Sequence, residues 1–97
     1  MNVRHLPLVS EELDDAVDYY EKEQEGLGFR LWLEVESNIQ WIARNPEIPR
    51  LRNGIYRRVN LKTFPYYISY VIRPTEILVV AIAHVRRRPE YWIKRIE

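Results

Sequence analysis

The residues best suited to chemistry lie near the C-terminal end of the sequence, in the segment HVRRRPEYW at positions 84–92. His84 titrates near neutral pH when unperturbed, so it can act as a general acid or base. The three arginines at 86–88 can bind phosphate or carboxylate groups through paired hydrogen bonds, and Tyr91 can stack on a base or donate its hydroxyl. The segment therefore has the residue types of an anion-binding or RNA-cleaving site.

The same segment also has a purely structural interpretation. Pro89 ends a strand, Tyr91 and Trp92 pack on the core, and the arginines pair with acidic helices. His84 is then a packed or capped residue at a strand end. Among the three arginines, Arg88 is the one we expect to be structural, because it precedes the proline.

A second basic pair, Arg57 and Arg58, lies in the segment IYRRVNL at 55–61. Apolar and polar residues alternate there, which is typical of a half-buried strand. Arg57 falls on the apolar face and needs a partner, for which Glu34 or Glu36 of a helix is the predicted carboxylate. Arg58 falls on the polar face and is the better functional candidate.

Charge is strongly segregated along the chain, although the net charge is only +1. Residues 1–40 carry ten acidic and three basic side chains, a net −7, whereas residues 41–97 carry four acidic and twelve basic side chains, a net +8. The basic half suits an anionic partner, whether nucleic acid, an acidic peptide or an acidic protein surface. It is equally compatible with side chains that only solvate the fold.

Composition excludes several classes of protein. The 97 residues fit one domain, spanning 1–97, and a hydrophobic fraction of 46% is that of a globular chain. There is no cysteine, so disulfides and thiolate metal sites are excluded, and we expect neither a metal nor a cofactor. No segment resembles a signal peptide or a membrane span, which favours a cytoplasmic protein that does not bind membranes.

Two helices are predicted in the first half of the chain. An apolar stripe at helical spacing follows Ser10, whose hydroxyl we expect to cap the first helix. The segment GLG at 26–28 interrupts the pattern, and a second helix runs from about Phe29 to Asn45. Trp32 and Trp41 of this second helix are predicted core residues.

Strands follow in the second half. The segments 55–61, 66–72 and 76–84 are rich in β-branched and aromatic residues, and short links favour antiparallel pairing. The last of them is almost wholly apolar, which places it centrally in the sheet, whereas 3–9 contains Pro7 and adds at most an edge strand. The fold class is therefore α+β: an N-terminal strand, a two-helix hairpin on a small antiparallel sheet, and a short C-terminal tail.

We expect the sheet face opposite the helices to stay partly open. Alternation places a shallow basic and aromatic surface there, with small side chains between its members. Its residues are Tyr56, Arg58, Asn60, Lys62, Tyr67, Ser69, Ala81 and Ala83.

The segments YRRVNLKTFPYYISYVI and AIAHVRRRPEYWIKR, in this order and spacing, resemble the ParE/RelE superfamily of bacterial toxins, and in particular its ParE-like plasmid stabilisation branch. The segment DDAVDYYEKEQEGLGFRLWLEV is similar to the helical hairpin of that family, so the resemblance covers nearly the whole chain. It implies the toxin of a type II toxin-antitoxin module, neutralised by an acidic, partly disordered antitoxin.

The resemblance implies two possible modes of growth inhibition. RelE-type toxins cleave mRNA on the ribosome, whereas ParE-type toxins bind DNA gyrase. Tyr67 stands where RelE-like enzymes carry an arginine, which removes a cation from the transition state of cleavage and favours gyrase binding. The alternatives are a ribosome-dependent endoribonuclease and a non-toxic binding domain of the same fold.

These considerations predict two overlapping sets of site residues. For catalysis, should the chain be an endoribonuclease, the candidates are His84, Arg58 and Tyr91. For binding the target or the antitoxin, the candidates are Arg57, Arg58, Lys62, Tyr67, Arg86, Arg87 and Tyr91.

Overall fold

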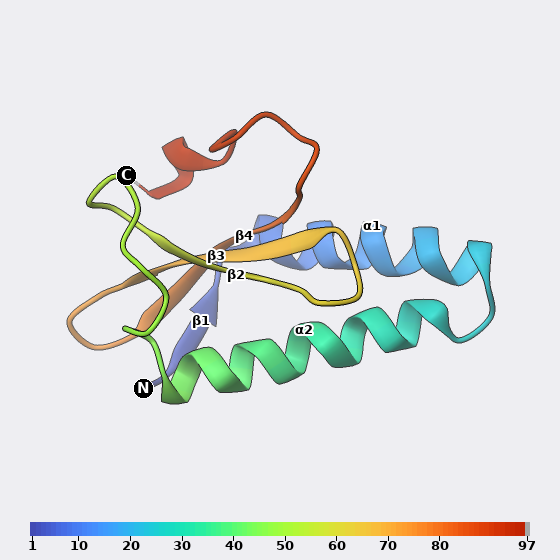
Figure 1. Cartoon of the computed structure of the whole chain (residues 1–97), viewed down its shortest axis with the longest axis horizontal. Helices are drawn as coiled ribbons and strands as arrows, with labels where there is room; N and C mark the ends of the chain where they lie inside the picture. Colours follow the sequence, from blue (N-terminus) through green and yellow to red (C-terminus); the bar gives the residue numbers. More distant parts are fainter. Residues whose placement is uncertain (97) are drawn as a thin grey trace.

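A computed structural model describes residues 1–96 of the chain, and residue 97 lies outside the described residues. In chain order the elements are β1 (Val3–His5), α1 (Pro7–Glu23), α2 (Leu27–Arg44), β2 (Arg57–Asn60), β3 (Tyr66–Ile72), β4 (Ile77–His84) and the 3-10 helix η1 (Ile93–Ile96). Figure 1 shows the helical hairpin on one side of the sheet and the C-terminal tail, in red, on the other. The predicted α+β class is confirmed.

The first helix begins at Pro7 rather than at Ser10, so the predicted cap is wrong. Proline suits the first helical position because its φ is already helical and no partner is needed for a backbone N–H. Leu6 is the residue before it, in an extended conformation. The hydroxyl of Ser10 instead lies 2.9 Å from Nε2 of His5. The N-terminal strand accordingly ends at His5, well before position 9.

The turn between the helices depends on Gly26 and Gly28. Gly26 has φ of +86°, in the left-handed region that glycine adopts without strain. A Cβ at Gly28 would lie 2.5 Å from the carbonyl oxygen of Val17, so only glycine allows α2 to approach α1 this closely. The carboxylate of Glu21 accepts hydrogen bonds from both glycine amides, at 2.8 and 3.0 Å. The predicted break is confirmed, with α2 starting at Leu27.

The sheet has the strand order β1-β4-β3-β2. The pairs β2–β3 and β3–β4 are antiparallel, as predicted, and β4 is an inner strand with all but its last residue buried. The edge strand β1 runs parallel to β4, so the sheet is mixed. Parallel pairing of distant segments becomes possible because the whole helical hairpin forms the long connection that it requires.

The prediction of an open sheet face is wrong, because the tail after Pro89 covers it. Trp92 is 1% exposed and forms a second core cluster with the tail-facing side of β3 and β4. Ser69 is completely buried there. The small side chains on this face are therefore packed under the tail. Alternation along a strand shows which face a residue lies on, but it does not show whether that face is covered or open.

Trp32 is not the core residue that the sequence predicts. The buried stripe of α2 comprises Leu31, Val35 and Ile42. Trp32 lies one position beyond this stripe, is 40% exposed and stacks on the ring of Phe29 at 6.1 Å between centroids. Trp41, in contrast, packs partly buried against the helix-side core, as predicted.

Within the described part of the chain, neither helix combines the length and the apolar character that crossing a bilayer would require.

Candidate functional site

The C-terminal tail is fixed on the sheet by its aromatic residues. The Trp92 indole packs edge to face with the rings of Tyr56 and Tyr67, with ring centroids 4.6 and 6.4 Å apart. The indole Nε1–H also donates to the hydroxyl of Tyr67 at 2.9 Å. The interpretation of Tyr91 and Trp92 as docked residues is thus correct, and Tyr67 is a buried part of the fold.

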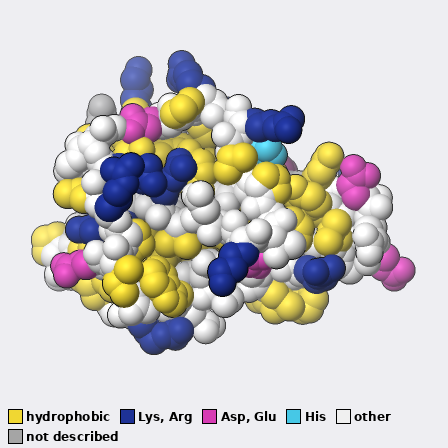
Figure 2. All heavy atoms as spheres, in the orientation of Figure 1, with side chains coloured by type: hydrophobic (Ala, Val, Ile, Leu, Met, Phe, Trp, Pro, Cys, Tyr) yellow, Lys and Arg dark blue, Asp and Glu magenta, His cyan; other side chains and the backbone are white. Residues whose placement is uncertain are grey.

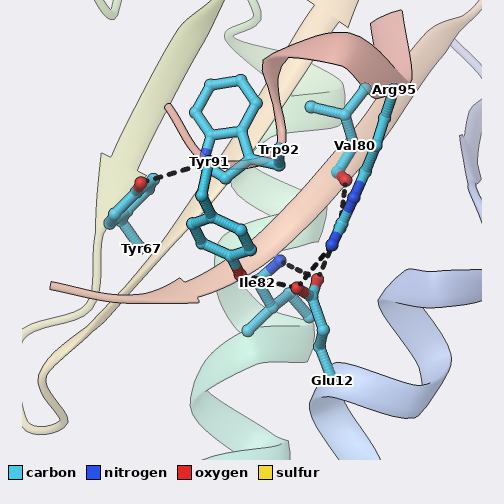
Figure 3. Close-up of polar contacts among 7 residues, drawn as sticks. All are labelled: Glu12, Tyr67, Val80, Ile82, Tyr91, Trp92 and Arg95. Atoms are coloured by element: carbon cyan, nitrogen blue, oxygen red, sulfur yellow. Dashed lines mark hydrogen bonds and ion pairs between the residues drawn. The ribbon is translucent and has the colours of Figure 1, made fainter. Parts of the chain in front are cut away.

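Glu12 of α1 is the polar anchor of this tail, and Figure 3 shows its partners converging on one carboxylate. The hydroxyl of Tyr91 donates to Glu12 at 2.6 Å, and the guanidinium of Arg95 donates to both carboxylate oxygens at 3.1 and 3.2 Å. The backbone N–H of Ile82 adds a further bond at 3.1 Å. Since these donors come from β4 and the tail, Glu12 joins three parts of the chain.

Sequence reasoning missed Glu12, and the signal for it was present. Val9 and Ala16 are buried, and Glu12 is placed between them at spacings of three and four residues. An acidic residue on the buried side of a helix needs a partner. The sequence predicts that the acidic helices pair with the arginines at 86–88, whereas the structure pairs Glu12 with Arg95.

A cavity of about 270 Å³ lies beside this anchor. Its lining includes Glu12, Tyr66, His84, Arg87 and Tyr91. The guanidinium of Arg87 stacks on the ring of Tyr91 at 3.7 Å from the centroid. The cavity therefore brings together three predicted residues: His84, Arg87 and Tyr91.

The groups in this cavity are largely committed to contacts within the fold. Nδ1 of His84 accepts a hydrogen bond from the backbone N–H of Arg86 at 3.0 Å, and the imidazole packs edge to face with the ring of Tyr66, with centroids 5.0 Å apart. Burial, followed by the hydrogen bond to Glu12, raises the pKa of Tyr91 to about 12. A tyrosine that holds its proton this firmly is a poor general acid near neutral pH.

The third catalytic candidate, Arg58, lies on the opposite face of the sheet. Its guanidinium stacks over Tyr67 at 4.4 Å, on the tail-covered side, whereas His84 pairs with Tyr66 on the helix side. The strand register gives this separation directly: Arg58 pairs with Ser69 and His84 with Tyr66, and residues three positions apart along β3 point to opposite faces. A β-bulge lies further along the sheet, where Ser69 pairs with Ala81 but Tyr70 pairs with Val79, and it shifts the alternation along β4.

The bulge also changes which residues share a sheet face with His84. Strict alternation along the segment 76–84 predicts that His84 lies on the same face as Leu78, Val80 and Ile82, and this prediction is wrong. Leu78 and Val80 belong to the tail-side core, whereas Ile82 belongs to the helix-side core. Only Ile82 therefore shares the face of His84.

The other predicted binding residues are dispersed. Arg57 donates to the carbonyl oxygens of Glu47 and Pro49, at 3.1 and 2.6 Å, so its predicted partner is wrong. The carboxylate of Glu34 instead accepts the backbone N–H groups of Lys62 and Thr63. The carbonyl oxygens of Glu47 and Pro49 satisfy the half-buried guanidinium of Arg57 without the desolvation of a second charge.

Lys62 lines a groove of about 550 Å³ between α2 and β2, together with Trp41 and Val59. Arg86 is exposed on the loop after β4. Arg88 is also exposed, and Arg87 rather than Arg88 packs its side chain on the tail.

Residues 1–96 contain no group of three His, Cys, Asp or Glu side chains placed to hold a metal ion.

The bond between Tyr91 and Glu12 leads to a pH prediction. The folded-state pKa, about 12, lies above the roughly 10 of a tyrosine in an unfolded chain. Burial of the neutral hydroxyl and its bond to Glu12 therefore contribute stability that is fully present below pH ~10 and is lost as the pH rises through about 12. Ionisation of tyrosine is followed by the absorbance of tyrosinate during a pH titration. Relative to the wild-type protein, Tyr91→Phe should lack one tyrosine that ionises near pH 12. The same titration in denaturant is the control, where the missing signal should lie near pH ~10; loss near ~10 in the folded protein would contradict the assignment.

Comparison with known proteins bears on the family and the fold of the chain. Residues 3–89 match the family described as the ParE toxin of the type II toxin-antitoxin system, parDE. No curated protein matches the chain. Among solved structures, the "Chromosomal ParDE TA system from P. aeruginosa" superposes with a TM-score of 0.66 at 16% identity, covering 89% of this chain and 97% of that one. The structural likeness supports the fold, and the family match over residues 3–89 means that the chain belongs to the ParE toxin family of type II toxin-antitoxin systems.

Proposed function

We propose that the chain inhibits growth by binding a replication target such as DNA gyrase, and that a cognate antitoxin neutralises it. The observation that supports binding over RNA cleavage is the separation of the catalytic candidates. Arg58 lies on the tail side of the sheet and His84 on the helix side, and Tyr91 of the tail reaches the cavity beside His84. General acid-base catalysis requires groups within hydrogen-bond reach of one reacting centre.

The accessible part of the predicted binding set is basic. Lys62, Arg86 and Arg87 are exposed, whereas Tyr67 is buried and Arg57 is engaged with backbone carbonyls. Exposed positive charges favour association with an acidic surface mainly by steering the encounter and excluding wrong partners. An antitoxin with an acidic, partly disordered segment has the matching charge, and covering these residues would block the target.

Residues 1–97 are proposed to act as one toxin domain. Two observations support this: the helix-side and tail-side cores share strands β3 and β4, and Glu12 connects α1 with the tail. The proposed targets place the activity in the cytoplasm.

A gyrase supercoiling assay with the purified chain tests the proposal. We expect inhibition at stoichiometric excess, weakened about tenfold or more by Arg86→Glu, because a like charge at an interface opposes association. Arg30→Glu changes the same charge at an exposed position of α2 and is the matched control. Adding the purified antitoxin should restore supercoiling.

Two results would contradict the proposal. One is unchanged supercoiling by a folded wild-type chain. The other is new mRNA cleavage in a translating extract, which would restore the endoribonuclease assignment and make His84 the first residue to substitute.

A further inference from the structure

Arg58, a member of the predicted binding set, lies on the tail side of the edge strand β2 beside two further arginines, Arg50 and Arg52. Figure 2 shows a group of Lys and Arg side chains where Figure 1 has the loop between α2 and β2, in green, and the start of β2. Arg52 bridges to Tyr56, two positions before Arg58, and the charges of Arg58 and Arg50 both act on Arg52. We propose that these three arginines form a binding site for a phosphate group.

The sheet register places Arg52 and Arg58 side by side. Arg52 and Tyr56 form an isolated antiparallel bridge, in which the two residues lie directly opposite each other. Arg58 follows Tyr56 by two positions, so it projects from the same face. Diagonal neighbours of this kind lie roughly 7–8 Å apart, with their Cβ atoms somewhat closer, so two long side chains can reach one ligand.

The backbone holds all three positions firmly. The bridge at Arg52 is closed by Asn53 and Gly54, with φ of +51° and +66°, and by hydrogen bonds of 2.7 and 3.2 Å between Arg52 and Tyr56. Arg50 directly follows Pro49, whose carbonyl accepts the bond from Arg57. Arg58 is fixed by its pairing with Ser69. A site built on such fixed positions loses little freedom when a ligand binds.

The positive charge in this cluster is not neutralised within the described residues. Between Met1 and Ile96, the ion pairs are Arg4–Glu76 and Arg95–Glu12, and neither involves the cluster. Glu90 is the acidic residue of the tail that contacts this loop. Its carboxylate accepts hydrogen bonds from the side chains of Asn53 and Tyr56 and from none of the three arginines. Partial burial, and then the charges of Arg58 and Arg50, lower the pKa of Arg52.

Arg58 carries a further unmet requirement. Its Nε is buried without a hydrogen-bond partner, and its guanidinium carbon lies over the ring of Tyr67, 4.4 Å from the centroid. Stacking on an aromatic ring leaves the outer edge of the guanidinium free to donate. An anion that receives this edge would compensate part of the cost of burial.

The chemistry of the cluster favours phosphate over a single carboxylate. A carboxylate brings one charge and two oxygens, whereas a phosphate group brings up to two charges and three oxygens that can accept paired bonds from several guanidinium groups. Three arginines at one place are therefore matched better by phosphate. The phosphate can belong to a small phosphorylated compound or to a nucleic acid backbone.

The test is a titration of the full-length protein with sodium phosphate at constant pH and constant ionic strength, followed by thermal unfolding and by calorimetry. We expect a saturable rise in melting temperature, because a ligand that binds the folded state stabilises it. Arg52→Ala should weaken binding about tenfold or more, since it removes a whole charge-assisted donor group. Arg50→Ala should weaken it as well, and Arg30→Ala on α2 should leave it unchanged.

Circular dichroism shows whether each variant is folded. If Arg52→Ala does not fold, Arg50→Ala replaces it in the phosphate titration. Two further probes identify the source of the phosphate. Tight binding of pyrophosphate that depends on Arg52 assigns the site to small phosphorylated compounds. Arg52-dependent binding of a short DNA duplex, without measurable binding of pyrophosphate, assigns it to a nucleic acid backbone.

Three outcomes would overturn the proposal. Phosphate and chloride at equal ionic strength give the same melting temperature, or Arg30→Ala weakens binding as much as Arg52→Ala, or citrate and glutamate bind more tightly than phosphate. None of these outcomes alters the gyrase assay, so the two proposals fail independently.

Discussion

Trp92→Ala should destabilise the protein by about 3–5 kcal/mol, the usual cost of truncating a fully buried tryptophan. The indole is 1% exposed, and its loss removes the packing against Tyr56 and the bond to the hydroxyl of Tyr67. The tail would lose its main apolar contact, and the buried sheet face around Ser69 would meet water. Urea unfolding followed by far-ultraviolet circular dichroism measures the free energy of unfolding without depending on tryptophan fluorescence.

Trp32→Ala is the matched control, because it removes the same side chain from an exposed position. Trp32 is 40% exposed and packs on the exposed ring of Phe29. We expect a loss within about 1 kcal/mol. Equal losses for the two substitutions would mean that the tail does not cover the sheet in solution as it does in the structure.

Glu12→Gln should destabilise the fold by about 2–4 kcal/mol. The side chain keeps its size, but one carboxylate oxygen becomes an amide nitrogen, which faces donors from Tyr91 and Arg95. The half-buried guanidinium of Arg95 would then lack its counter-charge. The same urea unfolding measures the loss.

Glu11→Gln is the control for Glu12→Gln, since Glu11 is the exposed neighbour on the same helix and carries the same charge. Its effect should stay within roughly 0.5 kcal/mol. Combining Glu12→Gln with Tyr91→Phe should cost less than the two single losses added together, because both remove the same contact. Strict additivity would show that Tyr91 and Glu12 are not coupled.

The sequence by itself determined the elements and most of their order. Helical periodicity identified both helices, and the steric limit at Gly28 agrees with the predicted break between them. Apolar content placed β4 inside the sheet, because a strand covered on both faces has no polar alternation. The start of α1 was misplaced since two local signals competed, and Pro7 at the first helical position prevailed over a cap at Ser10.

Only the tertiary structure decided which face each functional side chain occupies. Alternation assigns a residue to one of two faces but does not reveal what covers that face, so a tail around Trp92 can bury a surface predicted to be open. One bulge beside Ser69 is enough to shift Ala81 and the residues after it relative to Leu78. The partnership of Glu12 with Arg95, 83 residues apart, likewise follows from packing and from no local pattern.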